Sequence, residues 1–182
     1  MRERKPVIGV TCNFDYRDAV GMVSGMGITG QDWDFVSGDY VYILEKAGAI
    51  PVLIPQYGDL EAAKPFLEQL DGVLISGGHD VGPERYGAFP KGYCGTIMPM
   101  RDEQDIAISR YFMMEKKKPI LGICRGIQIT AWSEDRVPEA MELEDHPFAV
   151  AVQWHPEMMY DSSEQMKLLQ AFVKAAEKGT EA

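Results

Sequence analysis

Residues 119–128 read Pro-Ile-Leu-Gly-Ile-Cys-Arg-Gly-Ile-Gln, an apolar strand that runs into a turn of small residues around Cys124 and then into the start of a helix. This layout is that of a nucleophile elbow, in which the side chain at the turn projects from the carboxyl edge of a parallel sheet. Flanking glycines permit the tight backbone, and the helix N-terminus favours thiolate over thiol. The stretch therefore predicts a parallel sheet with Cys124 as a candidate nucleophile.

The rest of the chain alternates short β-branched runs with helical stripes, which predicts a parallel sheet covered by helices on both faces. Strands are expected at Val7–Cys12, Pro51–Pro55, Gly72–Ser76, Pro119–Cys124 and Phe148–His155. Helices are expected at 40–47, at 63–70, from about Arg101 to Lys118, and from Ser162 to Gly179. Pro65 inside the second stripe predicts either a kink or a helix that begins there. Ser162 and Gln165 form a capping box for the last helix.

Composition and charge exclude several classes of protein. The 182 residues are 46% hydrophobic and 25% charged, which fits a single folded domain and not a disordered or collagen-like chain. The net charge of −10 at pH 7 opposes binding to nucleic acid or to anionic membranes. Because no apolar run approaches the ~20 residues of a membrane span and no signal-peptide core follows Met1, we expect a cytoplasmic protein. Three cysteines without a Cys-x-x-Cys pair indicate neither a disulfide framework nor a thiolate zinc site.

Two further motifs lie where strands end. Residues 153–157, Gln-Trp-His-Pro-Glu, place Glu157 two positions after His155, so the carboxylate can hold one ring nitrogen while the other faces Cys124. Residues 75–80, Ile-Ser-Gly-Gly-His-Asp, place a diglycine where backbone N–H groups can point at a developing oxyanion. The diglycine lacks the Lys and Ser/Thr of a phosphate loop and the spacing of a dinucleotide fingerprint. Since the strand ends of a parallel sheet converge, the three motifs predict one catalytic site.

Taken with Arg101-Asp102-Glu103, these motifs resemble the gamma-glutamyl-gamma-aminobutyrate hydrolase family of the class I glutamine amidotransferase superfamily. The resemblance runs from Val7 through the last helix. It implies an α/β fold, a flavodoxin-like three-layer sandwich with a central, mostly parallel sheet. It also implies hydrolysis of a γ-glutamyl amide through a thioester, with no metal and no organic cofactor. For Arg101-Asp102-Glu103 we expect a structural role, an ion pair at the start of a helix.

The resemblance assigns a role to each site residue. Cys124 is the nucleophile, His155 is the general base and then the general acid, and Glu157 orients His155. The backbone N–H groups of Gly78 and Arg125 form the oxyanion hole.

The chain departs from the family after Gln128, where relatives continue the elbow helix and add a long segment that walls the pocket. Here residues 129–135 lead almost directly to residues 137–142, which resemble the strand before His155. Residues 1–182 are thus expected to form one hydrolase domain that lacks a family segment near 128–130. Either the protein has lost this segment, or the printed sequence omits residues of a longer chain. A Cα–Cα distance far beyond ~3.8 Å near residues 128–130 would reveal an omission.

Three functions follow as expectations. The first is a cysteine-dependent amidohydrolase acting on a small γ-glutamyl amine. The second is a glutaminase subunit that supplies ammonia to a synthase partner. The third is an inactive binding or regulatory relative that has lost the pocket wall. The sequence does not decide which amine leaves or whether the chain forms a homo-oligomer.

Overall fold

The computed structural model describes residues 4–17, 19–89, 94–125 and 139–178, and it contains a six-stranded sheet with the strand order β4-β1-β5-β6-β8-β7. The strands of the chain are β1 (Val7–Thr11), β2 (Asn13–Asp15), β3 (Trp33–Phe35), β4 (Ile50–Ile54), β5 (Gly72–Ile75), β6 (Ile120–Ile123), β7 (Ala140–Glu142) and β8 (Ala149–Val152). Strands β4, β1, β5, β6 and β8 are mutually parallel, and β7 is an antiparallel edge. The predicted mostly parallel α/β fold is confirmed.

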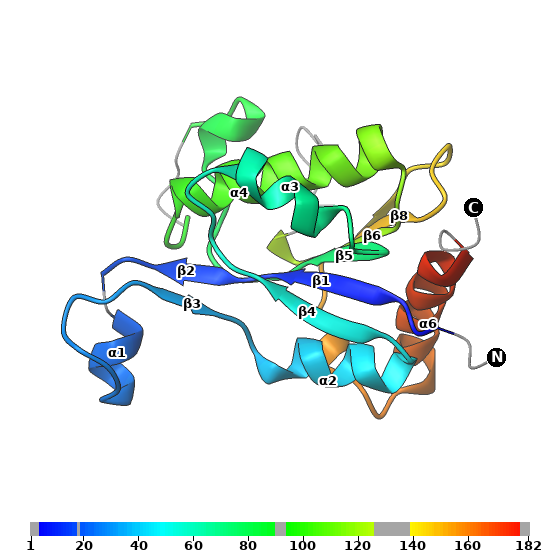
Figure 1. Ribbon diagram of the computed structural model, residues 1–182, viewed down its shortest axis with the longest axis horizontal. Helices are drawn as coiled ribbons and strands as arrows, with labels where there is room; N and C mark the ends of the chain where they lie inside the picture. Colours follow the sequence, from blue (N-terminus) through cyan, green and yellow to red (C-terminus); the bar gives the residue numbers. More distant parts are fainter. Residues whose placement is uncertain (1–3, 18, 90–93, 126–138, 179–182) are drawn as a thin grey trace.

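Helices cover both faces of this sheet (Figure 1). The helices are α1 (Ala19–Ser24), α2 (Gly38–Ala47), α3 (Leu60–Leu67), α4 (Pro99–Arg110) and α6 (Ser163–Lys178), with a π-helical continuation of α4 at Tyr111–Lys116 and 3-10 turns at Pro83–Tyr86 and Pro156–Met158. Helices α2 and α6 pack on one face, where residues such as Ile43, Leu44 and Phe172 are fully buried. Helices α3 and α4 pack on the other face, with Leu67 and Ile108 in its core. Helices α2, α3 and α6 thus each bury an apolar stripe, whereas α4 also buries charged and polar side chains.

The helix ends follow local sequence signals. Asp59 caps α3 by accepting a hydrogen bond from the backbone N–H of Glu61 at 2.9 Å, so the helix begins at Leu60 and continues through Pro65. The alternative in which the helix begins at Pro65 was therefore wrong, because the Asp59 cap sets the start and the proline lies inside the helix, two residues before its last residue. One half of the predicted capping box of α6 is confirmed, since the backbone N–H of Gln165 donates to Oγ of Ser162 at 3.4 Å. The reciprocal half is not formed, because Oε1 of Gln165 accepts from Trp154 and the Ser162 N–H donates to the carbonyl of Met159.

The predicted strand Phe148–His155 is shorter in the structure. Strand β8 ends at Val152, which pairs with Ile123, the last residue of β6. Strand β6 does not continue past this pair, because the chain turns sharply at Cys124. His155 therefore lies in a loop that begins a 3-10 turn, not on a strand.

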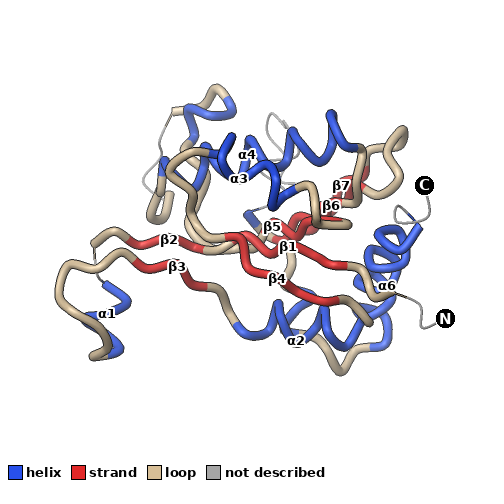
Figure 2. The backbone as a smooth tube through the Cα atoms, viewed as in Figure 1, coloured by secondary structure: helices blue, strands red, loops and turns tan. Residues whose placement is uncertain are grey.

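The stretch before α2, in which the sequence predicts no clear element, includes an arm beside the main sheet (Figure 2). The arm is the antiparallel pair β2–β3 with helix α1, and Met22, Val23 and Ile28 on it are exposed. The elbow helix after Arg125 and the sequence join near 128–130 lie outside the described residues. The predicted domain organisation therefore stays a prediction.

Candidate active site

The turn at Cys124 has the geometry of an elbow. Strand β6 ends at Ile123, and Cys124 follows with φ 55°, a left-handed conformation that non-glycine residues seldom adopt. Its backbone N–H donates to the carbonyl of Val152 at 2.7 Å, so the turn is held against the end of β8. Such strain costs ~1–3 kcal/mol and typically occurs where a side chain must be aimed.

His155 and Glu157 form a bonded pair beyond the end of β8. Nδ1 of His155 lies 2.6 Å from Oε1 of Glu157, and the carboxyl side chain is only 3% exposed while the imidazole is 42% exposed. Because an ionised carboxylate only accepts hydrogen bonds, the ring proton is placed on Nδ1 and Nε2 keeps its lone pair. The histidine is thus oriented by a buried acid and open on its other side.

Gly77 brings the cysteine and the histidine to one point. A Cβ atom built on Gly77 would lie 3.1 Å from Cε1 of His155 and 3.5 Å from Cβ of Cys124. Both side chains therefore approach the same position just beyond the end of β5, and only a residue without a side chain leaves this space free. The three motifs that the sequence placed at strand ends do meet at one edge of the sheet.

The environment of the Cys124 sulfur favours the thiol. Burial raises the pKa of Cys124, and the charges of Glu157 and Asp80 raise it further. Two hydrogen bonds oppose this increase, one from the backbone of Arg125 and one from Gln153, whose Nε2 donates to Sγ at 3.7 Å. Proton removal by a neighbouring base is therefore needed for the sulfur to act as a nucleophile near neutral pH.

Tyr40 is a site residue that the sequence did not single out, because it falls on the apolar stripe of α2. Its hydroxyl accepts a hydrogen bond from the backbone N–H of Gly77 at 2.9 Å. Burial raises its pKa, and the nearby charge of Glu157 raises it further. A tyrosine on a helical stripe looks like any core aromatic, so only the tertiary structure connects it to the site.

Below the site lies a buried cluster of four charges: Arg101, Asp102 and Asp105 of α4, and Arg125 of the elbow. Nε of Arg125 donates to Asp105 Oδ2 at 3.1 Å, and its Nη2 donates to Asp102 Oδ1 at 2.5 Å. Nε of Arg101 forms an ion pair with the same Asp105 oxygen at 3.2 Å. The cluster carries two positive and two negative charges and is neutral as a whole.

The expected ion pairing at the helix start is found, but its partners lie outside the motif. Arg101 pairs one turn further along α4, and Asp102 pairs with the elbow. Glu103 points to the surface, where it pairs with Arg85 at 3.0 Å. Residues adjacent in sequence point to different sides of a helix, so they meet different partners.

The two residues assigned to the oxyanion hole both belong to segments tied to this cluster. Gly78 has φ 134°, and a Cβ there would overlap the side chains of Asn13 and Arg101, so the position requires glycine. The side chain of Arg125 donates through Nη1 to the carbonyl of His79 at 2.7 Å. The elbow and the diglycine loop are thus joined directly.

Comparison with known proteins agrees with this geometry. The family model described as Peptidase C26 matches residues 6–131 and 127–157. The chain belongs to the peptidase C26 family. The two matched parts overlap at residues 127–131, beside the place where the sequence predicts a missing family segment.

Two relatives that match this chain carry glutamine amidotransferase names. A protein of Mycobacterium tuberculosis, named as a candidate glutamine amidotransferase, is 26% identical over 246 positions that cover 94% of this chain and 75% of the relative. Because 246 exceeds the 182 residues of this chain, the relative has residues inside the aligned region that this chain lacks. A glutamine amidotransferase-like protein of Lactococcus lactis subsp. cremoris is 33% identical over 90 residues, which cover 50% of this chain and 47% of the relative. The chain thus matches less than half the length of this relative.

A solved structure shares the fold of this peptidase C26 chain. A protein from Thermoplasma acidophilum, described as a candidate GMP synthase subunit, superposes with a TM-score of 0.56 at 15% identity, covering 98% of this chain and 97% of that one. At this identity the likeness establishes the α/β fold alone.

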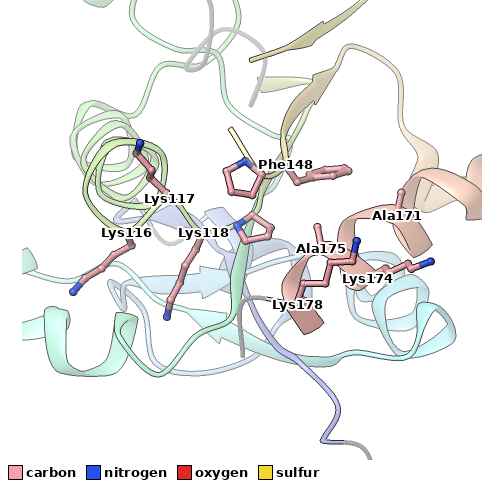
Figure 3. Close-up of a pocket in the computed structure, with 10 residues that line it drawn as sticks. Lys116, Lys117, Lys118, Phe148, Ala171, Lys174, Ala175 and Lys178 are labelled. Carbon is pink, nitrogen blue, oxygen red and sulfur yellow. The ribbon is translucent and has the colours of Figure 1, made fainter. Parts of the chain in front are cut away.

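Other features of the described part of the chain lie away from Cys124. A surface cavity of about 650 Å³ at the opposite end of β6 is lined by five lysines and an apolar floor that includes Phe148 (Figure 3). Two of these lysines are already engaged, because Lys116 pairs with Glu68 and Lys118 donates to the carbonyls of Glu68 and Leu70. Within the described ranges, no group of His, Cys, Asp and Glu has the arrangement of a metal site, and no helix is long and apolar enough to cross a bilayer.

Proposed function

We propose that this peptidase C26 protein hydrolyses the γ-glutamyl amide bond of a small γ-glutamyl amine through a thioester on Cys124. The observation that carries the proposal is that Cys124 and the Glu157-held imidazole of His155 both approach the side-chain position of Gly77. A thiol beside a base that is itself oriented by a buried acid is the arrangement of nucleophilic amide cleavage.

The chemistry runs in two halves. In the first, Nε2 of His155 takes the thiol proton as the sulfur of Cys124 attacks the amide carbonyl. The resulting oxyanion accepts hydrogen bonds from the backbone N–H groups of Gly78 and Arg125. The amine then leaves with the proton from His155, and the acyl group stays on sulfur as a thioester. In the second half, His155 takes a proton from water as the water oxygen attacks the thioester carbonyl. The C–S bond then breaks, the sulfur of Cys124 regains the proton from His155, and glutamate is released.

A glutaminase that supplies ammonia to a synthase is the second candidate. The solved structure with the same fold is named as part of a GMP synthase, and its chain is covered almost completely by this one. This candidate predicts glutamine as the preferred substrate and an activity that depends on a partner protein. We also propose a cytoplasmic location, which rests on the lack of an apolar run long enough to span a membrane. The proposed absence of nucleic acid and membrane partners rests on the net charge of −10.

The test is glutamate release from a panel of γ-glutamyl amines and glutamine. We expect wild type to release glutamate and Cys124→Ala to lose about 10³-fold or more of the kcat. The matched control is Cys94→Ala, since Cys94 is a free, half-buried cysteine outside the site and should be dispensable. Equal turnover by Cys124→Ala would remove the nucleophile assignment. No release by wild type would instead favour the inactive binding relative.

A further inference from the structure

We propose that Arg101 is a positioning residue that sets the direction of the Gly78 N–H group, the oxyanion donor of the proposed function. The inference rests on that function for its catalytic meaning, while its geometric part concerns only the peptide between Gly77 and Gly78. Nothing in the sequence motif itself connects Arg101 to this peptide.

The first step is the set of contacts that Arg101 makes. Nη2 of Arg101 donates to the carbonyl of Ser76 at 2.8 Å, to the carbonyl of Gly77 at 3.1 Å and to Oγ of Ser76 at 3.0 Å. Nη1 donates to Oδ1 of Asn13. Asn13 in turn donates through Nδ2 to the same Gly77 carbonyl at 3.3 Å. One guanidinium thus contacts two consecutive peptide carbonyls, and the Gly77 carbonyl accepts a second hydrogen bond from Asn13.

The second step is the geometry of a peptide unit. The Gly77 carbonyl and the Gly78 N–H belong to one planar group, and in a trans peptide they point in opposite directions. The described residues contain no cis peptide bond. Holding the carbonyl toward Arg101 and Asn13 therefore turns the Gly78 N–H away from them. Without this anchor, two consecutive glycines would allow the peptide to rotate at little cost.

The third step is the link to the second donor. Asp105 Oδ2 lies 3.2 Å from Nε of Arg101 and 3.1 Å from Nε of Arg125, so one carboxylate oxygen joins both guanidinium groups. Asp102 holds Arg125 through Oδ1 and accepts from the backbone N–H of Gly82 through Oδ2 at 2.9 Å. Helix α4 therefore fixes the elbow and the diglycine loop relative to each other.

Energetics also favour a positioning role over a purely stabilising one. Arg101, Asp102 and Asp105 have no exposed surface and Arg125 is 2% exposed. Burial lowers the pKa of Arg101 to about 10, which reflects the cost of keeping this charge away from water. Buried ion pairs often stabilise a fold no better than apolar residues of the same size. What apolar residues cannot do is hold two peptide carbonyls in one direction.

The test compares Arg101→Lys with wild type in three measurements. Lysine keeps the charge but cannot hold the fork of contacts that a guanidinium makes. We expect kcat for γ-glutamyl amide hydrolysis to fall about 10²–10³-fold, the usual effect of losing an oxyanion donor, with KM changed less than about threefold. Alkylation of Cys124 by iodoacetamide, which develops no oxyanion, should stay within about twofold of wild type. In spectra of 15N-glycine-labelled protein, the Gly77 and Gly78 amide signals should shift.

Two further variants keep the test decisive. Arg85→Lys makes the same substitution at an arginine that pairs with Glu103 of the same helix and not with the diglycine loop, and it should behave as wild type. Asn13→Ala removes the second hydrogen bond to the Gly77 carbonyl and should lower the kcat and shift the Gly77 and Gly78 signals by smaller amounts. This variant tests the proposal even if Arg101→Lys does not fold.

The outcomes separate the two proposals. Hydrolysis and alkylation falling in parallel in Arg101→Lys, or unmoved Gly77 and Gly78 signals, would overturn the positioning role. Wild type without hydrolysis would overturn the proposed function alone, and the glycine spectra would then decide whether Arg101 orients the peptide.

Discussion

Glu157 holds His155 through a contact of 2.6 Å between Oε1 and Nδ1, and the carboxylate is buried while the imidazole is open to solvent on its far side. The pair determines which ring nitrogen carries the proton and which one is free to act as a base. It also provides a negative charge beside the imidazolium that forms during catalysis. Both effects depend on the charge of Glu157.

Replacing this carboxylate by an amide should therefore impair chemistry more than binding. We expect Glu157→Gln to lower kcat by roughly 10²–10⁴-fold with little change in KM, because the amide does not stabilise the imidazolium. Steady-state kinetics with a γ-glutamyl amide measures this. The control Glu142→Gln changes an exposed glutamate on β7 and should keep full activity. A kcat for Glu157→Gln within threefold of wild type would contradict the role of Glu157.

Gly77 should tolerate no side chain. In Gly77→Ala the new methyl group would lie 3.0 Å from the Tyr40 hydroxyl and 3.1 Å from Cε1 of His155, so the imidazole must move. We expect kcat/KM to fall about 10–10²-fold, because small displacements of reacting groups are costly. Gly38→Ala is the control, since no atom lies within 4 Å of its added Cβ and the position opens helix α2. Equal kcat/KM in both variants would show that Gly77 does not shape the site.

The hydroxyl of Tyr40 should matter for stability. Tyr40→Phe leaves the Gly77 N–H without its acceptor at a position where Tyr40 is 4% exposed. We expect the free energy of unfolding to fall by ~1–3 kcal/mol, the cost of an unsatisfied buried donor. Urea unfolding measures the change. The control Tyr42→Phe, at a tyrosine that is 49% exposed, should keep a free energy of unfolding within ~0.5 kcal/mol of wild type. If Tyr40→Phe lowers the free energy of unfolding by no more than this, the hydrogen bond to Gly77 does not stabilise the fold.

The ionisation of Cys124 gives a prediction with a definite sign. Burial raises the pKa of this thiol above 9.0, the ordinary value, so the midpoint of the alkylation rate against pH should lie above that pH. The Gln153 amide donates to the sulfur and lowers the pKa, because a donor stabilises the thiolate. Gln153→Leu should therefore move the midpoint to still higher pH and reduce the rate at pH 7. Mass spectrometry of the Cys124 peptide follows the reaction, and a midpoint that moves downward would refute this account.

Local sequence was enough for the layers of the fold and for the neighbourhood of the site. The alternation of β-branched runs with helical stripes predicts the parallel sheet, because the apolar face of the sheet is buried only when helices cover it, and the apolar stripe of each helix is buried only against the sheet. Motifs at the ends of β5, β6 and β8 predict a shared edge, because parallel strands end on the same side. The meeting of Gly77, Cys124 and His155 follows from this topology.

The partners of buried groups came only from the tertiary structure. Periodicity identifies which side chains are apolar, but it does not say which loop a buried arginine reaches. Arg101 was expected only to form an ion pair at the helix start, and besides its ion pair with Asp105 it also holds the carbonyls of Ser76 and Gly77. Tyr40 matches a core residue in sequence, and its contact with Gly77 spans 37 positions. The alternation of side chains in residues 148–155 also placed His155 on a strand, which was wrong, because a strand ends where the neighbouring strand no longer provides hydrogen-bond partners. The sequence determined the helices and strands and identified the reactive side chains. Long-range contacts determined how those side chains are oriented, because hydrogen-bond partners far apart in the chain come together only when the elements pack.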